Sequence, residues 1–169
     1  DKHVTFEVRS FRRLFGNSSD DIDGTARYYA LCDTRNLPGN LSLKTNPREQ
    51  NLRTNVARGI IESFDAATDT PSFHNLNRGL LISADTVGYN NKTHKLTLRM
   101  PDPERHGVVD GGHTYRVIKD YVDDLVQRKY VVLEIMTGIE ENFEKIAGAR
   151  NTSVQVKQKS LAELEGKLD

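Results

Sequence analysis

Short runs in which apolar and polar residues alternate recur along the chain, and this period of two is typical of β-strands with one buried face. The Asn90-Asn91 dipeptide lies between two of these runs and favours a hairpin turn. Alternation predicts a strand at Val4–Phe11, and apolar or β-branched runs predict strands at Ala26–Thr34 and Tyr130–Met136. Gly79–Val87, Lys95–Arg99 and Gly107–Val109 are also predicted to be strands.

Other segments carry apolar residues at helical spacing. Asn55–Phe64 fits a helix with Thr54 as its cap, and Tyr115–Val126 fits a second. Asn142–Ala149 and Ser160–Leu168 are also predicted to be helical. Because strands and helices alternate, we expect an α/β or α+β fold in which helices pack on a mixed sheet. Its strands should lie near residues 27–33, 80–87, 95–99 and 130–136.

With 169 residues, the chain has the length of one domain, and we expect a single domain over residues 1–169 with a helical appendage at 139–169. The chain starts at Asp1 without a methionine, so we interpret it as a fragment whose remainder is one of its partners. Two prolines and several asparagines make Arg35–Asn51 a long irregular connection, and such connections are often functional.

Charge and cysteine content limit the possible functions. The chain has 24 basic and 24 acidic residues, so binding to a nucleic acid would need a local basic face. Cys32 is the only cysteine, which excludes an intrachain disulfide and a thiolate metal cluster, and we expect it to be buried. No apolar run approaches the length of a membrane span, and no signal peptide opens the chain. We therefore expect a cytoplasmic protein without a membrane partner.

The segment Asp110-Gly-Gly-His113 follows a strand and precedes a helix. The start of a helix presents backbone N–H groups and a partial positive charge, which suit a phosphate. Gly111 and Gly112 would let the chain turn sharply and a ligand approach, while His113 and Arg116 would add charge or proton transfer. The alternative interpretation is that Asp110 only caps the helix and His113 is an ordinary surface residue.

Polar residues in other loops are candidates for the remaining walls of a pocket. Asn77 and Arg78 precede a predicted strand, Arg48 and Arg53 precede a predicted helix, and Asn151 would close over the pocket. We therefore predict Asp110 and His113 as catalytic residues. The predicted ligand-binding residues are Gly111, Gly112, Thr114, Arg116, Asn77, Arg78, Arg48, Arg53 and Asn151.

Five segments in order resemble the abortive-infection phage-resistance (AIPR) family, and they cover most of residues 45–160. These segments are Asn46–Asn51, Val56–Phe64, Phe73–Ala84, Gly107–Thr114 and Ala149–Val156. The resemblance implies a bacterial antiviral defence protein.

More distantly, the motif resembles the Asp-Gly-Gln-His-Arg pattern and the partitioning-protein/sulfiredoxin superfamily, which binds nucleoside triphosphates at this position. That likeness implies a core of the same kind and places Gly111, Gly112, His113 and Arg116 against phosphate. The candidate cofactor is then a nucleoside triphosphate with magnesium. Thr114 stands where the pattern has its arginine.

Three hypotheses follow. The first is a phage-defence domain that binds the phosphate of a nucleotide or nucleic acid at the Asp110–Thr114 turn. The second is a hydrolase of phosphodiesters or nucleotides that uses His113 and Asp110. The third is a structural module that assembles with the rest of its chain. His106, Asp110 and His113 could in principle bind a metal, but a strand separates the two histidines, so we expect no metal there.

Overall fold

The computed structural model of the protein describes residues 2–46 and 54–151. The helices are α1 (Asn55–Asp65), α2 (Phe73–Leu76) and α3 (Gly112–Tyr121), with 3-10 turns at Ser18–Asp20, Thr34–Asn36 and Val122–Asp124. Residues 143–151 are also helical. The strands are β1 (His3–Glu7), β2 (Ser10–Phe15), β3 (Ala26–Asp33), β4 (Leu80–Ala84), β5 (Thr86–Asn90), β6 (Lys95–Arg99), β7 (Gly107–Asp110) and β8 (Tyr130–Thr137).

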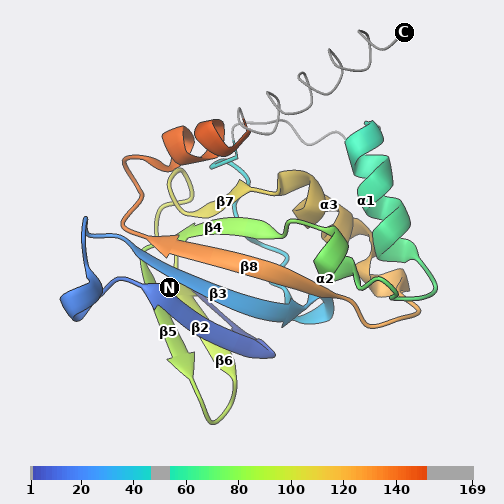
Figure 1. The fold of residues 1–169 in the computed structure, drawn as a ribbon, viewed down its shortest axis with the longest axis horizontal. Coiled ribbons are helices and arrows are strands. Elements are labelled where there is room, and N and C mark those ends of the chain that lie inside the picture. The colour runs from blue at the N-terminus through green and yellow to red at the C-terminus, as the bar shows by residue number, and fades with distance from the viewer. Residues whose placement is uncertain (1, 47–53, 152–169) are drawn as a thin grey trace, which may run out of the picture.

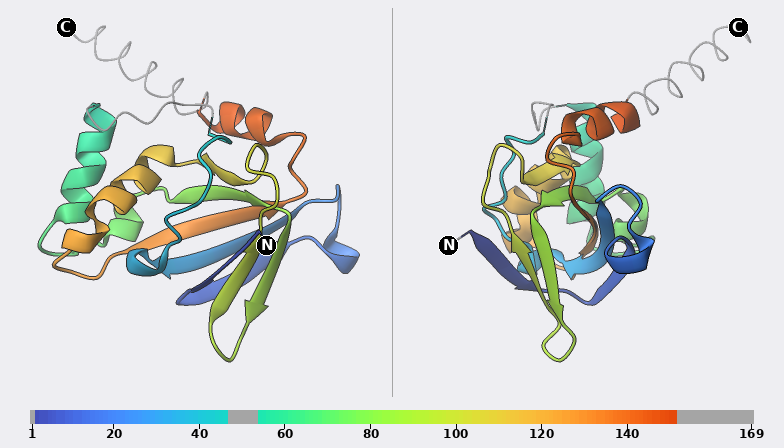
Figure 2. Two further views of the ribbon diagram at one scale, coloured as in Figure 1. Left: turned by 180° about the vertical axis from the view of Figure 1, so that it is seen from behind. Right: turned by 90° about the vertical axis from the view of Figure 1, so that its left-hand side faces the viewer.

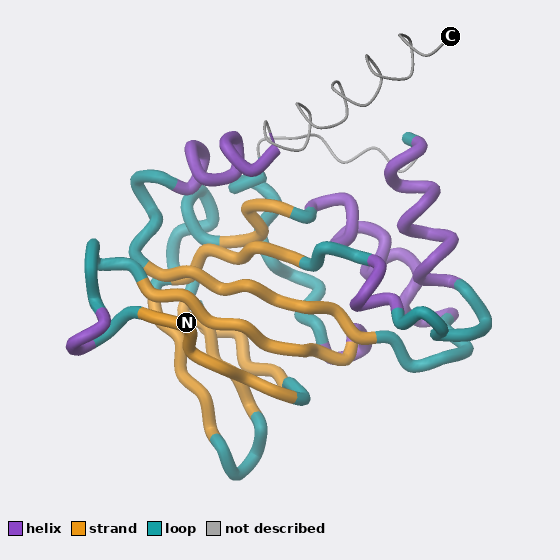
Figure 3. The backbone as a smooth tube through the Cα atoms, viewed as in Figure 1, coloured by secondary structure: helices purple, strands orange, loops and turns teal. Residues whose placement is uncertain are grey.

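In the described residues these strands form two sheets. The larger has the order β2-β3-β8-β4-β7 and is mixed, because β4 runs parallel to β8 while its other pairs are antiparallel. The smaller is antiparallel, with the order β1-β6-β5, and its β5–β6 hairpin projects from the body of the molecule (Figure 2). Helices α1, α2 and α3 gather at one end of the larger sheet (Figures 1 and 3). The mixed helix and strand content predicted from the sequence is confirmed.

Two predicted strands were wrong in extent. Val4–Phe11 is not one strand, since it ends in the small sheet at Glu7 and the chain enters the large sheet as β2. Gly79–Val87 is likewise divided between β4 and β5, which belong to different sheets. In both cases the chain turns a corner at which the hydrogen-bonding partners change. The bounds of Lys95–Arg99 are confirmed, but this strand belongs to the small sheet rather than the mixed one.

The helices differ from the prediction mainly at their ends. Helix α1 is confirmed, and the Thr54 hydroxyl accepts a hydrogen bond from the Ala57 amide at 3.2 Å. Helix α3 begins at Gly112 rather than Tyr115 and gives way to a 3-10 turn at Val122. No helix among the described residues has both the length and the apolar character needed to cross a membrane.

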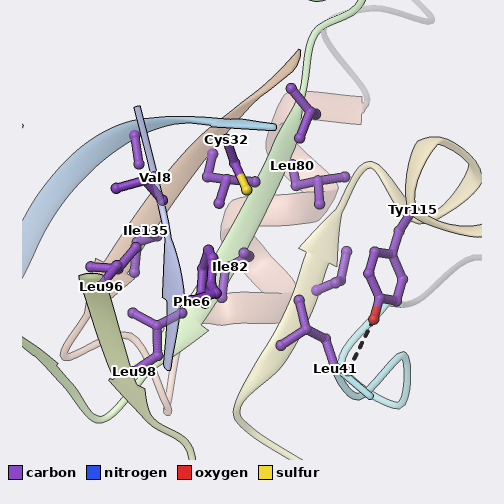
Figure 4. Close-up of a cluster of buried hydrophobic side chains, with 14 of the residues drawn as sticks. Phe6, Val8, Cys32, Leu41, Leu80, Ile82, Leu96, Leu98, Tyr115 and Ile135 are labelled. Atoms are coloured by element: carbon purple, nitrogen blue, oxygen red, sulfur yellow. Dashed lines mark hydrogen bonds between the residues drawn. The ribbon is translucent and has the colours of Figure 1, made fainter. Parts of the chain in front are cut away.

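The main core lies between the inner face of the large sheet, the small sheet and α3 (Figure 4). Phe6 and Leu98 reach it from the small sheet, Ile82 and Ile135 from the large one, and Val117 from α3. Cys32 is fully buried in this core, as predicted, and burial raises the pKa of its thiol to about 12.

A second apolar cluster covers only part of the outer face of the large sheet. Phe143 and Ala147 pack there on Leu81, Val109 and Met136. Strand β4 is therefore buried at every position, as expected for a strand covered on both faces. Strand β3 alternates between buried and half-buried residues, because the outer face at its position is more open.

Tyr115 connects α3 to the loop that follows the Thr34–Asn36 turn. Its buried hydroxyl donates a hydrogen bond to the Pro38 carbonyl at 2.6 Å. It also accepts one from the Leu41 amide at 3.0 Å, which Figure 4 shows as a dashed line. Burial raises the pKa of Tyr115, so the hydroxyl keeps the proton that it donates to the Pro38 carbonyl.

We expect Tyr115→Phe to lower the free energy of unfolding by about 1–3 kcal/mol, because the buried Leu41 amide loses its acceptor. Tyr121→Phe removes the hydroxyl of a half-buried tyrosine on the same helix and should change the free energy of unfolding by less than about 0.5 kcal/mol. Urea denaturation of the two variants measures both values, and equal losses would contradict this role for the Tyr115 hydroxyl.

Candidate functional site

Two turns of the backbone lie against each other at the start of α3. Gly111 joins β7 to α3 with a φ of 87°, and Gly79 leads into β4 with a φ of 80°. A β-carbon on Gly111 would lie 2.4 Å from the Gly79 carbonyl oxygen, and one on Gly79 would lie 2.2 Å from the Val132 carbonyl oxygen. Only glycine fits both positions. The sharp turn predicted in the Asp110–Thr114 segment is confirmed, but its positive φ belongs to Gly111 and not to Gly112.

Asn77 fixes these two turns to one another. Its side-chain oxygen accepts a hydrogen bond from the Gly79 amide at 2.8 Å, and its side-chain nitrogen donates one to the Thr114 hydroxyl at 2.9 Å. Asn77 therefore holds the approach to β4 against the first turn of α3. The short helix α2 leads to Asn77 and is anchored by Asp69. The Asp69 carboxylate accepts a hydrogen bond from the Phe73 amide at 2.9 Å, and it lies 3.2 Å from the ammonium group of the buried Lys129.

A half-open cavity of about 340 Å³ lies beside these turns. The β7–α3 turn forms one side, the Asn77–Gly79 segment another, and apolar side chains of α1 and α2 a third. The lining residues are Asn46, Val56, Ile60, Leu76, Asn77, Arg78, Gly79, Leu80, Leu81, Asp110, Gly111, Gly112, His113, Thr114, Glu134 and Arg150.

Glu134 on β8 is the most strongly paired charge in this lining. Arg150 donates two hydrogen bonds to its carboxylate, at 2.9 and 3.0 Å, and the Arg27 Nε lies 3.1 Å from it. The hydrogen bonds with Glu134 raise the pKa of Arg150, and this effect is larger than the lowering caused by burial. The nearby Asp110 carboxylate also raises the pKa of Arg150. The Asp110 carboxylate itself accepts a hydrogen bond from the Gly111 amide at 3.0 Å.

The cavity brings together most of the residues predicted from the motif and its neighbours. Asn77 and Arg78 line it with the Asp110–Thr114 segment, although they are more than thirty positions away in the sequence. Arg116 and Asn151 are not among the lining residues, and Asn151 lies at the end of the described part of the 143–151 helix. Arg48 and Arg53 lie outside the described residues. Their neighbour Asn46 does line the cavity.

Sequence reasoning missed Glu134 and Arg150. The available signal was the single carboxylate within the apolar strand Tyr130–Met136, because a charge at a largely buried strand position requires a partner. It also missed the apolar wall formed by Val56, Ile60 and Leu76, of which Val56 and Leu76 are exposed large hydrophobic residues.

The described residues do not bring His106, Asp110 and His113 together as a set of metal ligands. His106 lies instead with Asp85 and Glu140. Its Nδ1 accepts a hydrogen bond from the Asp102 amide, which leaves the ring proton on Nε2, 3.3 Å from a Glu140 oxygen. Since Asp85 also pairs with Arg99, these contacts are those of a hydrogen-bonded link between two loops.

A comparison with known protein families matches residues 43–167 to the AIPR protein family. This range contains the cavity-lining residues and the five segments on which the resemblance was based. No curated protein and no solved structure matches the chain significantly.

Two glycine substitutions should have opposite effects on stability. Gly111→Ala should lower the free energy of unfolding by at least about 1–2 kcal/mol, the cost of a left-handed conformation, with a further cost from the Gly79 carbonyl. Gly59→Ala, in the middle of α1, meets no described atom within 4 Å and should raise it by about 0.5–1 kcal/mol. Thermal or urea unfolding checks the sign of each change, and a Gly111→Ala protein as stable as wild type would refute the close approach.

Proposed function

Because the chain belongs to the AIPR family and acts in phage defence, we propose that it binds a phosphate of a nucleotide or nucleic acid at the start of α3. The observation that carries the proposal is that this helix start opens into the cavity beside the Arg78 side chain.

The start of α3 offers phosphate a favourable electrostatic environment. The first amides of a helix have no acceptor within the helix and carry a partial positive charge. The cap residue Gly111 has no side chain that would bind those amides, so a phosphate oxygen can approach them. His113 and Arg78 line the same cavity and supply further donors.

Carboxylates in the cavity do not oppose an anion as strongly as their number suggests. Glu134 is neutralised by two arginines, which leaves Asp110 as the principal negative charge near the turn. A magnesium ion between Asp110 and phosphate oxygens would turn this charge into an attraction. A nucleoside triphosphate with magnesium therefore fits the donor set, and the wall of Val56, Ile60 and Leu76 offers apolar contact for a base or sugar.

Isothermal titration with the four ribonucleoside triphosphates, with and without magnesium, tests the proposal. We expect binding that strengthens with magnesium and weakens about ten- to hundredfold in Arg78→Ala, the range for loss of a hydrogen bond to a charged group. The matched control is Arg58→Ala, which removes an exposed arginine of α1 that does not line the cavity.

Equal effects of Arg78→Ala and Arg58→Ala, or no binding at millimolar nucleotide, would contradict the proposal. His113→Ala separates binding from catalysis in the same assay. If inorganic phosphate is released by wild type but not by a His113→Ala protein that still binds nucleotide, the hydrolase hypothesis applies.

A further inference from the structure

Strand register places one row of side chains across the whole outer face of the large sheet. The Cα partners in this row are Arg12, Tyr29, Glu134, Leu81 and Asp110, on β2, β3, β8, β4 and β7 in turn. Because neighbouring strands are about 4.8 Å apart, the row is about 19 Å long. It starts at the candidate cavity, which Asp110, Leu81 and Glu134 line, and ends at the edge strand β2.

A helix packs over one half of this row and leaves the other half open. Over β4 and β7, the 143–151 helix packs on the sheet. Over β2, β3 and β8, no described helix lies in front of the strands, which face the viewer in Figure 1. Tyr29, Leu31 and Val132 are only half-buried there, and they line a shallow hollow of about 330 Å³ together with Arg12.

Arginine and tyrosine dominate the open half. A second hollow contains Tyr130, and the Arg9 guanidinium lies 5.8 Å from the centre of its ring. The carboxylates of Asp33 and Glu134 are already paired with arginines. Around the two hollows and the row there are five arginines and four carboxylates. The arginines are Arg9, Arg12, Arg27, Arg128 and Arg150, and the carboxylates are Glu7, Asp33, Glu134 and Asp110. This face therefore carries a small excess of positive charge in a chain whose formal net charge is +0.

We propose that the open face of β2, β3 and β8 binds a single-stranded nucleic acid. Tyr29 offers a ring on which an unpaired base stacks, and Arg9 and Arg12 contact the phosphates of the strand. The strand extends along the row toward the cavity, where the phosphate site at α3 holds its end. Only this last contact rests on the proposed function. A duplex keeps its bases stacked inside and gains nothing from Tyr29.

Fluorescence polarisation of labelled oligothymidylate and oligouridylate with the full chain tests the proposal, and the two probes distinguish DNA from RNA. The decisive pair is Arg12→Ala and Arg13→Ala. Both residues are exposed neighbours on β2, but Arg13 is the partner of the core residue Tyr28 and points to the opposite face. Arg12→Ala should weaken binding and reduce the slope of log affinity against log salt by about 0.7, the value for one phosphate contact on a single strand. Arg13→Ala should leave both unchanged.

Tyr29 provides an independent test of stacking. Tyr29→Leu should weaken binding roughly five- to hundredfold, whereas Tyr29→Phe keeps the ring and should bind as wild type does. Melting temperatures of the variants separate lost binding from lost folding. If Tyr29→Leu does not fold, the exposed Arg12 and Arg13 pair still decides the question.

Three results would overturn the proposal: no binding of either oligonucleotide, equal affinity for a duplex hairpin, or equal effects of the two arginine variants. Failure here is distinguishable from failure of the phosphate site. Triphosphate binding that is lost in Arg78→Ala but retained in Arg12→Ala, without oligonucleotide binding, supports the phosphate site alone. Oligonucleotide binding without triphosphate binding supports the sheet face alone.

Discussion

The carbonyl oxygens of Gly79 and Val132 lie only 2.4 and 2.2 Å from where the β-carbons of Gly111 and Gly79 would be, so three backbone segments pack without side chains between them. This contact brings the ends of β7, α2 and β8 to one place and aims the start of α3 into the cavity. The hydrogen bonds of Asn77 to Gly79 and Thr114 then fix that arrangement. The cavity thus depends on close backbone packing and on the Asn77 side chain that fixes it.

Whether a strand stays in one sheet decides how well it could be predicted from the sequence. Ala26–Asp33 and Tyr130–Thr137 each stay in one sheet over eight residues, so their apolar and β-branched content identified them correctly. Val4–Phe11 alternates regularly but crosses from one sheet to the other near Val8, whose amide donates a hydrogen bond to the His94 carbonyl. The alternation of apolar and polar residues shows which face of a strand is buried, but it does not show which strand lies next to it. The change from one sheet to the other therefore cannot be seen in the sequence.

For the site, the sequence indicated the motif because glycines between a strand and a helix restrict the local geometry. Asn77 was predicted from its position before a strand, and it does contact Thr114. Arg150 could not be predicted in the same way, since its partner Glu134 is sixteen positions earlier and the loop after β8 sets how the two meet. Such a pair depends on how the 143–151 helix packs on the sheet, which is set by the apolar contacts of Phe143 and Ala147.

The packing of the 143–151 helix also divides the outer face of the large sheet into a covered apolar part and an open part. The 143–151 helix buries the apolar residues of β4 and β7, and the same helix delivers Arg150 to the boundary of the covered area. A carboxylate at the half-buried position of Glu134 would be costly without partners, so Arg150 and Arg27 are needed there for stability alone. Because Arg150 and Arg27 are paired with Glu134, the excess positive charge of the open half comes from Arg9 and Arg12, and Glu7 beside Arg9 offsets part of it. A neutral total charge is therefore compatible with a face that carries a small positive excess.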